Sequence, residues 1–183
     1  MQNRQLDGMF RRALHKTVPW APAQLEGDYV IVDGARDARI HPAVASSRVA
    51  SMCLYDGALS PGLARVAPYL VRLEPGSRFA RTFYEDGWGD AWGLVVRSKA
   101  SMKALRRHFR TIAYARCDAG PKLLFRYYDV RVMRQFLPTC DATQLEQLFG
   151  PVDAFVLDSA GGHTPQIMYR GVDGQLEIEE VRA

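Results

Sequence analysis

The sequence predicts an α/β fold with a mixed, partly parallel central sheet, flanking helices and antiparallel strands toward the C-terminus. Short apolar runs alternate with amphipathic segments over residues 29–112, which is the pattern of strand–helix–strand units. One run, 91–96, is apolar on both faces, as expected of a central strand that is covered on both sides. Turn signals between short apolar runs after residue 112 indicate hairpins. The chain has 183 residues and is 48% hydrophobic, enough for one domain with its own core.

The first 27 residues are predicted to form an amphipathic helix and a linker, because apolar residues recur at helical spacing before two prolines. Residues 28–183 are then expected to form a single α/β domain. A short helix, limited by Pro42, is expected within 36–45. The first three strands are expected where apolar runs end at Asp-Gly or Pro-Gly turns: 29–32, 49–55 and 69–73.

Two serines indicate helix starts in the middle of the chain. Ser77 precedes a segment that carries Phe79 and Phe83, and Ser101 precedes an amphipathic helix that reaches Ile112. The apolar residues of this second helix form one stripe. Four basic residues lie off that stripe: Lys103, Arg106, Arg107 and Arg110.

After residue 112 the pattern predicts a hairpin, two short helices and further strands. The hairpin pairs 114–116 with 122–127 across an Asp-Ala-Gly-Pro turn. A helix follows over 130–137, and Asp141 with Gln144 forms a capping-box signature for the next helix. Three more strands are expected at 154–157, 166–170 and 175–178.

The composition narrows the classes of partner and cofactor. The net charge is +4, with arginine far more common than lysine. This is compatible either with solvated basic surfaces or with an acidic partner. No basic tract is dense enough to indicate nucleic-acid binding.

Three widely spaced cysteines and four histidines in unrelated contexts form no metal-ligand pattern, so we expect no metal and no cofactor. No apolar run approaches the ~20 residues of a membrane span, and the polar, basic N-terminal segment is not expected to act as a secretory signal, so we expect a cytoplasmic protein without membrane insertion.

Two aspartates are candidates for catalysis or for turns. Asp33 and Asp56 each end an apolar run, where catalytic acids of α/β folds often lie. Each also precedes a glycine, and Asp-Gly is a common turn signal. The turn is the favoured interpretation for both, and an enzyme that uses Asp33 or Asp56 remains the alternative.

Two aromatic segments stand out. Trp88 and Trp92 lie in a glycine-rich segment, and they are expected either to fill the core or to form an aromatic ledge for a partner. The run 125–131 places charges among three aromatic residues. There, Asp129 is predicted to cap the following helix, and Arg126 is predicted to pair with Asp129 or with Asp33.

Several motifs occur in the order known from one family. They are YVIVDGARD (29–37), LARVAPYLVRL (63–73), GWGDAWG (87–93), the helix at 98–110, LFRYYDVRV (124–132) and FGP (149–151). Over about residues 28–158 the chain resembles the type VI secretion adaptor chaperones, the domain-of-unknown-function 4123 family. The positions that match the family signature are Asp33, Gly34, Trp88, Gly89, Trp92, Gly93, Arg126, Tyr128 and Asp129.

The resemblance implies an adaptor and not an enzyme. Such proteins act as cytoplasmic chaperones that load an effector toxin onto a VgrG-type or PAAR spike protein. Many members continue into a helical lobe after the last strands, so the resemblance implies a minimal member with the α/β lobe alone. On this hypothesis we expect an apolar groove rimmed by arginines that holds a segment of the effector or of the spike.

Overall fold

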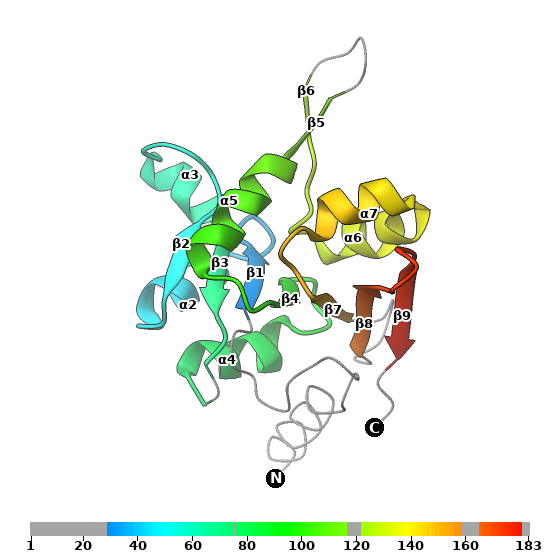
Figure 1. Cartoon of the computed structure of the whole chain (residues 1–183). Coiled ribbons are helices and arrows are strands. Elements are labelled where there is room, and N and C mark those ends of the chain that lie inside the picture. The colour runs from blue at the N-terminus through cyan, green and yellow to red at the C-terminus, as the bar shows by residue number, and fades with distance from the viewer. Residues whose placement is uncertain (1–28, 75, 117–121, 159–164, 181–183) are drawn as a thin grey trace.

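The computed structural model describes residues 29–74, 76–116, 122–158 and 165–180. The predicted N-terminal helix and linker, 1–27, and the predicted hairpin turn, 118–121, lie outside these residues. A seven-stranded sheet crosses the molecule in the order β2-β3-β1-β4-β7-β8-β9 (Figure 1). Its strands are β1 (Tyr29–Asp33), β2 (Ser51–Cys53), β3 (Pro68–Arg72), β4 (Gly93–Arg97), β7 (Ala154–Asp158), β8 (Pro165–Arg170) and β9 (Leu176–Glu180).

Helices cover the sheet, and a separate hairpin projects from it (Figure 1). The hairpin pairs β5 (Tyr114–Arg116) with β6 (Lys122–Leu124). The α-helices are α2 (Ile40–Ser46), α3 (Pro61–Val66), α4 (Arg78–Thr82), α5 (Met102–Ile112), α6 (Val130–Phe136) and α7 (Ala142–Phe149). A π-helical turn, η1 (Phe83–Gly87), extends α4, and a 3-10 turn, η2 (Leu137–Thr139), extends α6.

The α/β class is confirmed, but the predicted partly parallel sheet is wrong. Every strand pair of the described sheet is antiparallel. The alternation of strands and helices misled the prediction for a topological reason. The segment with α2 links β1 to β2, which run in the same direction, but β3 lies between them; likewise β1 lies between β3 and β4. Each crossover therefore skips one position of the sheet, and an antiparallel strand fills that position.

The central strands β1, β4 and β7 are buried on both faces, as the two-sided apolar pattern of 91–96 predicted. Residues of β1 alternate between the two cores, since successive side chains of a strand point to opposite faces. Tyr29 and Ile31 pack with the buried residues of α5, α6 and α7. Val30 and Val32 pack on the other face with residues of α2, α4 and η1. The protein thus has three layers, with helices on both sides of one sheet.

The predicted helix starts are confirmed at the level of single hydrogen bonds. The side chains of Ser77, Ser101 and Asp129 each accept a hydrogen bond from a backbone N–H of the helix that follows. Asp141 and Gln144 form the complete capping box of α7, with bonds of 2.8 and 2.9 Å. Such caps contribute about 1 kcal/mol each, which explains why their local sequence signals located the helices well.

Three local predictions need correction. The strand predicted over 49–55 is limited to β2, Ser51–Cys53. The strand predicted over 122–127 ends at Leu124, and the residues after it form a turn instead. The short helix α3 was not predicted; Ser60 caps it, Pro61 begins it, and none of its residues is buried. No helix in the described ranges is long and apolar enough to cross a membrane.

Candidate functional site

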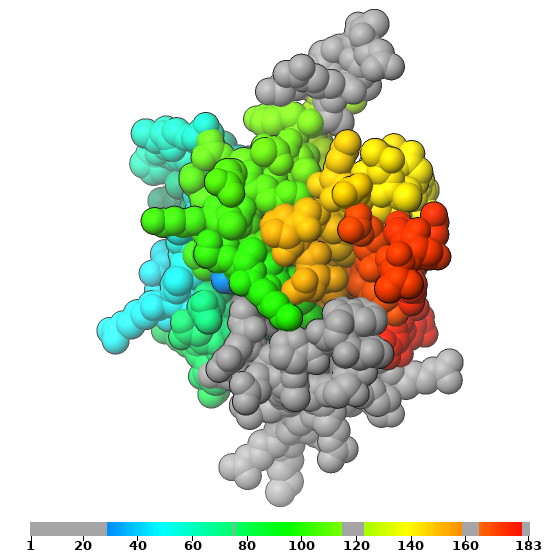
Figure 2. Space-filling model, in the orientation of Figure 1, coloured from blue at the N-terminus to red at the C-terminus, as the bar shows by residue number. Residues whose placement is uncertain are grey.

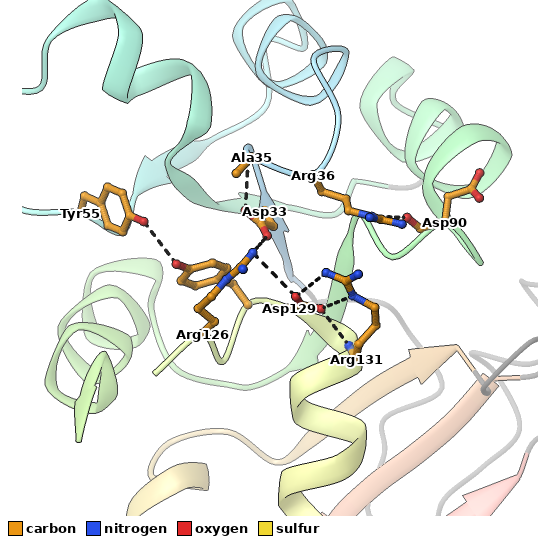
Figure 3. A network of polar contacts seen from close by, with 9 residues as sticks. Asp33, Ala35, Arg36, Tyr55, Asp90, Arg126, Asp129 and Arg131 are labelled. Atoms are coloured by element: carbon orange, nitrogen blue, oxygen red, sulfur yellow. Dashed lines mark hydrogen bonds and ion pairs between the residues drawn. The ribbon is translucent and has the colours of Figure 1, made fainter. Parts of the chain in front are cut away.

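A tight turn follows β6 and presents the charged junction of the chain. The backbone N–H of Asp129 donates to the carbonyl oxygen of Arg126 at 3.0 Å, which closes this turn. The Asp129 carboxylate then accepts from the backbone N–H of Arg131 at 3.0 Å and caps α6. The turn aims Arg126 toward the end of β1, as Figure 3 shows.

Asp33 lies at that end of β1 and is only 1% exposed. Its backbone N–H donates to the carbonyl oxygen of Trp92 at 2.8 Å, which ties it to the residue before β4. One carboxylate oxygen accepts from the backbone N–H of Ala35 at 3.1 Å, and the other accepts from Nη2 of Arg126 at 2.8 Å (Figure 3). Asp33 therefore both makes the predicted turn and holds a buried charge that Arg126 compensates.

Asp129 is the second buried carboxylate of the junction. Arg131 binds it in a fork, with Nε at 2.9 Å and Nη2 at 2.7 Å from its two oxygens. Nη2 of Arg126 lies 3.7 Å from Asp129 and so bridges it to Asp33. Burial acts to raise the pKa of the Asp129 carboxyl, but the hydrogen bonds and charges of the arginines outweigh burial and leave this pKa lowered. Both predicted pairings of Arg126 occur, and the one with Asp33 is closer.

Tyr127 and Tyr128 lie between this junction and the surface of the molecule. The guanidinium of Arg126 lies 5.8 Å from the centre of the Tyr128 ring. The hydroxyl of Tyr128 is 3.2 Å from the hydroxyl of Tyr55, which follows β2. Tyr127 stacks on Phe109 of α5, with ring centres 5.4 Å apart. Burial raises the pKa of both Tyr127 and Tyr128, so both hydroxyls stay protonated at neutral pH.

A groove of about 880 Å³ opens directly above these tyrosines. It lies where β2 with the loop after it, α3, α5 and the base of the β5–β6 hairpin meet. In the space-filling view α5 (green) lies between the cyan segment that contains α3 and the yellow helices α6 and α7 (Figure 2). The apolar and aromatic lining residues are Met52, Leu54, Tyr55, Leu59, Leu63, Ala113, Tyr114, Leu124, Tyr127 and Tyr128.

One wall of the groove is strongly basic. The four residues that lay off the apolar stripe of the predicted helix line this wall: Lys103, Arg106, Arg107 and Arg110. Arg110 forms an ion pair with Asp56 across the groove, and Nε of Arg106 donates to the carbonyl oxygen of Cys53 at 2.8 Å. Lys103 and Arg107 form no ion pair within the part of the chain that the structure describes. The groove combines an apolar floor with an excess of positive charge.

The two aspartates of the enzyme alternative lie in different surroundings. Asp33 is buried in the junction, whereas Asp56 is exposed at the groove and accepts from the N–H of Gly57 at 2.8 Å. Among the described residues neither carboxylate pairs with a histidine or a lysine; the partners are Arg126 and Arg110. In the same ranges no group of three or more His, Cys, Asp and Glu residues is arranged to hold a metal ion.

Trp88 and Trp92 lie in the core, on the face of the sheet opposite to the groove. Both are buried among residues of α2, α4 and η1. A Cβ at Gly87 would come within 2.7 Å of the Trp92 ring, so this glycine is required for the close approach of the ring. Of the two predicted alternatives, the structure places the tryptophans in the core.

The sequence pattern identified the residues of the junction, whereas a groove was expected without a location. Asp33, Arg126, Tyr128 and Asp129 all come together as one network. Among the groove residues, Asp56 and Tyr128 were named for other reasons and the basic residues were noted as positions on a helix. The spacing of those residues, 103, 106, 107 and 110, is the i, i+3, i+4, i+7 pattern of one helix face. That spacing was the one sequence feature that could have indicated the basic wall of the groove. The exposed apolar residues of α3 could not be assigned to a wall, because α3 itself was not predicted.

Comparison with known proteins gives one match. The sequence model of the family described as "Domain of unknown function (DUF4123)" matches residues 29–147. No curated protein and no solved structure matches the chain. The matched range includes β1, the Trp-Gly segment, α5 and the whole junction, and it covers more than half of the sequence. The chain therefore belongs to the DUF4123 family.

Proposed function

We propose that this protein is an adaptor chaperone that binds an effector of a type VI secretion system and helps to load it onto a VgrG or PAAR spike protein. The observation that carries the proposal is the groove, because the adaptor hypothesis expected an apolar groove rimmed by arginines. Family membership supports the proposal, because the family's motifs in this chain are those on which its resemblance to the type VI secretion adaptors rests. On this proposal the protein acts by binding and carries out no catalysis.

The groove has the features of a protein-binding site. Its lining includes three large side chains that are well exposed, Leu63 at 43%, Tyr114 at 49% and Leu124 at 46%. They come from two different walls, α3 and the β5–β6 hairpin, so a bound segment would cover them together. Tyrosine is enriched among the residues that contribute most to interface energy, and burying an exposed leucine removes apolar surface from water. Burying these side chains would therefore supply much of the affinity for a partner.

The junction gives this site a rigid floor. Tyr127 and Tyr128 line the groove and are themselves buried beneath it. Phe109 holds the first ring, and Tyr55 and Arg126 hold the second. A preformed surface loses little conformational freedom when a partner binds, which favours affinity. The family signature at Arg126, Tyr128 and Asp129 thus supports the site without forming its rim.

The proposal is tested by co-expression with the products of the neighbouring genes, followed by affinity purification. Wild-type protein is expected to retain an effector or a spike protein. A variant with Leu63→Ser and Leu124→Ser is expected to lose at least ten-fold in affinity, because both residues line the groove. The matched control carries Val172→Ser and Ile178→Ser, two exposed apolar residues at the β9 end of the sheet, and is expected to bind as wild type does.

Two results would contradict the proposal. One is that no effector or spike protein from the gene cluster is retained by the wild-type protein. The other is that the groove variant, shown to be folded by circular dichroism, retains its partner as well as the control does.

A further inference from the structure

We infer that the groove takes an acidic amphipathic helix of the partner protein. This inference rests on the proposed function, since it assumes that the groove is where a partner segment binds. It adds the secondary structure, the charge and the side-chain spacing of that segment, which family membership does not supply. Three features of the described residues lead to it.

The first feature is the regular spacing of the basic wall. Lys103, Arg106, Arg107 and Arg110 form a single stripe along α5, about 10 Å long at 1.5 Å per residue. Among the residues that line the groove, Asp56 is the one carboxylate, and it is paired with Arg110. A second helix that lies along α5 would meet this stripe with Asp or Glu residues at the same i, i+3, i+4 and i+7 spacing.

The second feature is that the neighbouring sheet edge is closed to an added strand. On either side of β2, Ala50 and Leu54 bond to β3, so the backbone groups of Ser51 and Cys53 point to the free edge. Nε of Arg106 donates to the outward carbonyl oxygen of Cys53 at 2.8 Å. Strand addition needs a row of unoccupied backbone groups, and β2 is only three residues long. A segment in the groove must therefore satisfy its own backbone hydrogen bonds, as a helix does.

The third feature is the separation of apolar and charged residues within the groove. Leu63 on α3 and Leu124 on β6 offer apolar side chains on walls other than α5, and the tyrosine rings form the floor. The basic side chains come from α5. A ligand that matches both must carry apolar residues on one face and acidic residues beside them, which is the pattern of an amphipathic helix.

The test is a selection that needs no natural partner. The full-length protein is immobilised and used to select from a displayed library of random 16-residue peptides. The selected peptides are then measured against a groove variant, Lys103→Glu with Arg107→Glu. The matched control makes the same change in charge on α4, which packs on the opposite face of the sheet, with Arg78→Glu and Arg81→Glu.

The expected consensus contains Asp or Glu at i, i+3 or i+4, and i+7, with apolar residues on the adjoining face of the helix. The peptides should gain helical circular dichroism when they bind, should bind the groove variant at least ten-fold more weakly than the wild type, and should weaken as salt is raised. The α4 control should bind them as the wild type does.

Three outcomes would overturn the inference: a basic or neutral consensus, an extended bound peptide, or the absence of peptides that distinguish the groove variant from the control. The result separates this inference from the proposed function. An effector that binds through the groove without an acidic helix refutes the inference alone. Acidic helices that bind the groove, with no effector or spike partner in the gene cluster, refute the adaptor function alone.

Discussion

Replacing Arg126 by methionine should destabilise the fold, although nearly half of the arginine side chain is exposed. The substitution keeps an unbranched, flexible side chain, although a shorter one, and removes the guanidinium charge. Among the described residues, the Asp33 carboxylate at the end of β1 would then keep the hydrogen bond from the N–H of Ala35 alone. A buried carboxylate that loses its charged partner is costly, because it has been removed from water without compensation.

The expected loss of stability can be estimated from the exposed fractions of the Arg126 and Asp33 side chains. Removing one partner of a fully buried ion pair costs about 3–5 kcal/mol. The Arg126 side chain is 46% exposed while that of Asp33 is 2% exposed, so water can reach the site that the guanidinium leaves. We therefore expect the free energy of unfolding to fall by about 2–3 kcal/mol, below the value for a fully buried pair.

The assay is urea unfolding at pH 7, followed by the fluorescence of the buried tryptophans. With a slope of about 1–3 kcal/mol/M, the midpoint should fall by about 0.7–3 M. Adding Asp33→Asn should recover at least about 1 kcal/mol, since the buried charge is then gone. An exposed arginine of α4, Arg78→Met, is the control and should change stability by no more than about 0.5 kcal/mol. A change of that small size for Arg126→Met, or strict additivity with Asp33→Asn, would show that Arg126 does not compensate the buried Asp33 charge.

Three further predictions concern stability. Gly93→Ala should cost at least about 2 kcal/mol in urea unfolding, because a Cβ there would overlap the Ile31 carbonyl oxygen of the neighbouring strand, whereas Gly62→Ala, which meets no atom, should be nearly neutral. Asp141→Ala should cost about 1 kcal/mol by loss of the capping box, and a neutral result would show that the box does not stabilise α7. The pKa of Asp129 is lowered on folding, so its contribution is full above the unfolded value of about 3.9 and is lost as pH falls through the folded pKa. Asp129→Asn should therefore reduce the loss of stability below about pH 4, and an unchanged acid titration of stability would contradict this.

The sequence predicted those parts of the fold that depend on neighbouring residues. Ser77, Ser101, Asp129 and Asp141 were identified as caps because the groups that each one satisfies lie within three residues of it. Strand positions followed from short apolar runs between turns. Strand order could not be predicted in this way, because it depends on which strand fills the position that a crossover skips.

In the candidate site, too, the contacts between nearby residues were predictable and those that depend on packing were not. Asp129 and Arg126 are three residues apart, so their pairing was predictable, and Asp33 was one of two named partners across 93 residues. The groove is different, since its residues come from β2, α3, α5 and the β5–β6 hairpin and are related only by the packing of those elements. Their types are ordinary for a surface, and no local spacing distinguishes Leu63 or Leu124 as a lining residue.

The most direct test of the account is site-specific photocrosslinking in cells that carry the gene in its natural cluster. A benzophenone amino acid is placed at Leu63 or Leu124 in the groove, and at Ile178 on β9 as the control. An effector or a spike protein should be captured from positions 63 and 124 and not from 178. Capture of these proteins from 178 alone, or capture of neither from the groove positions, would contradict this prediction.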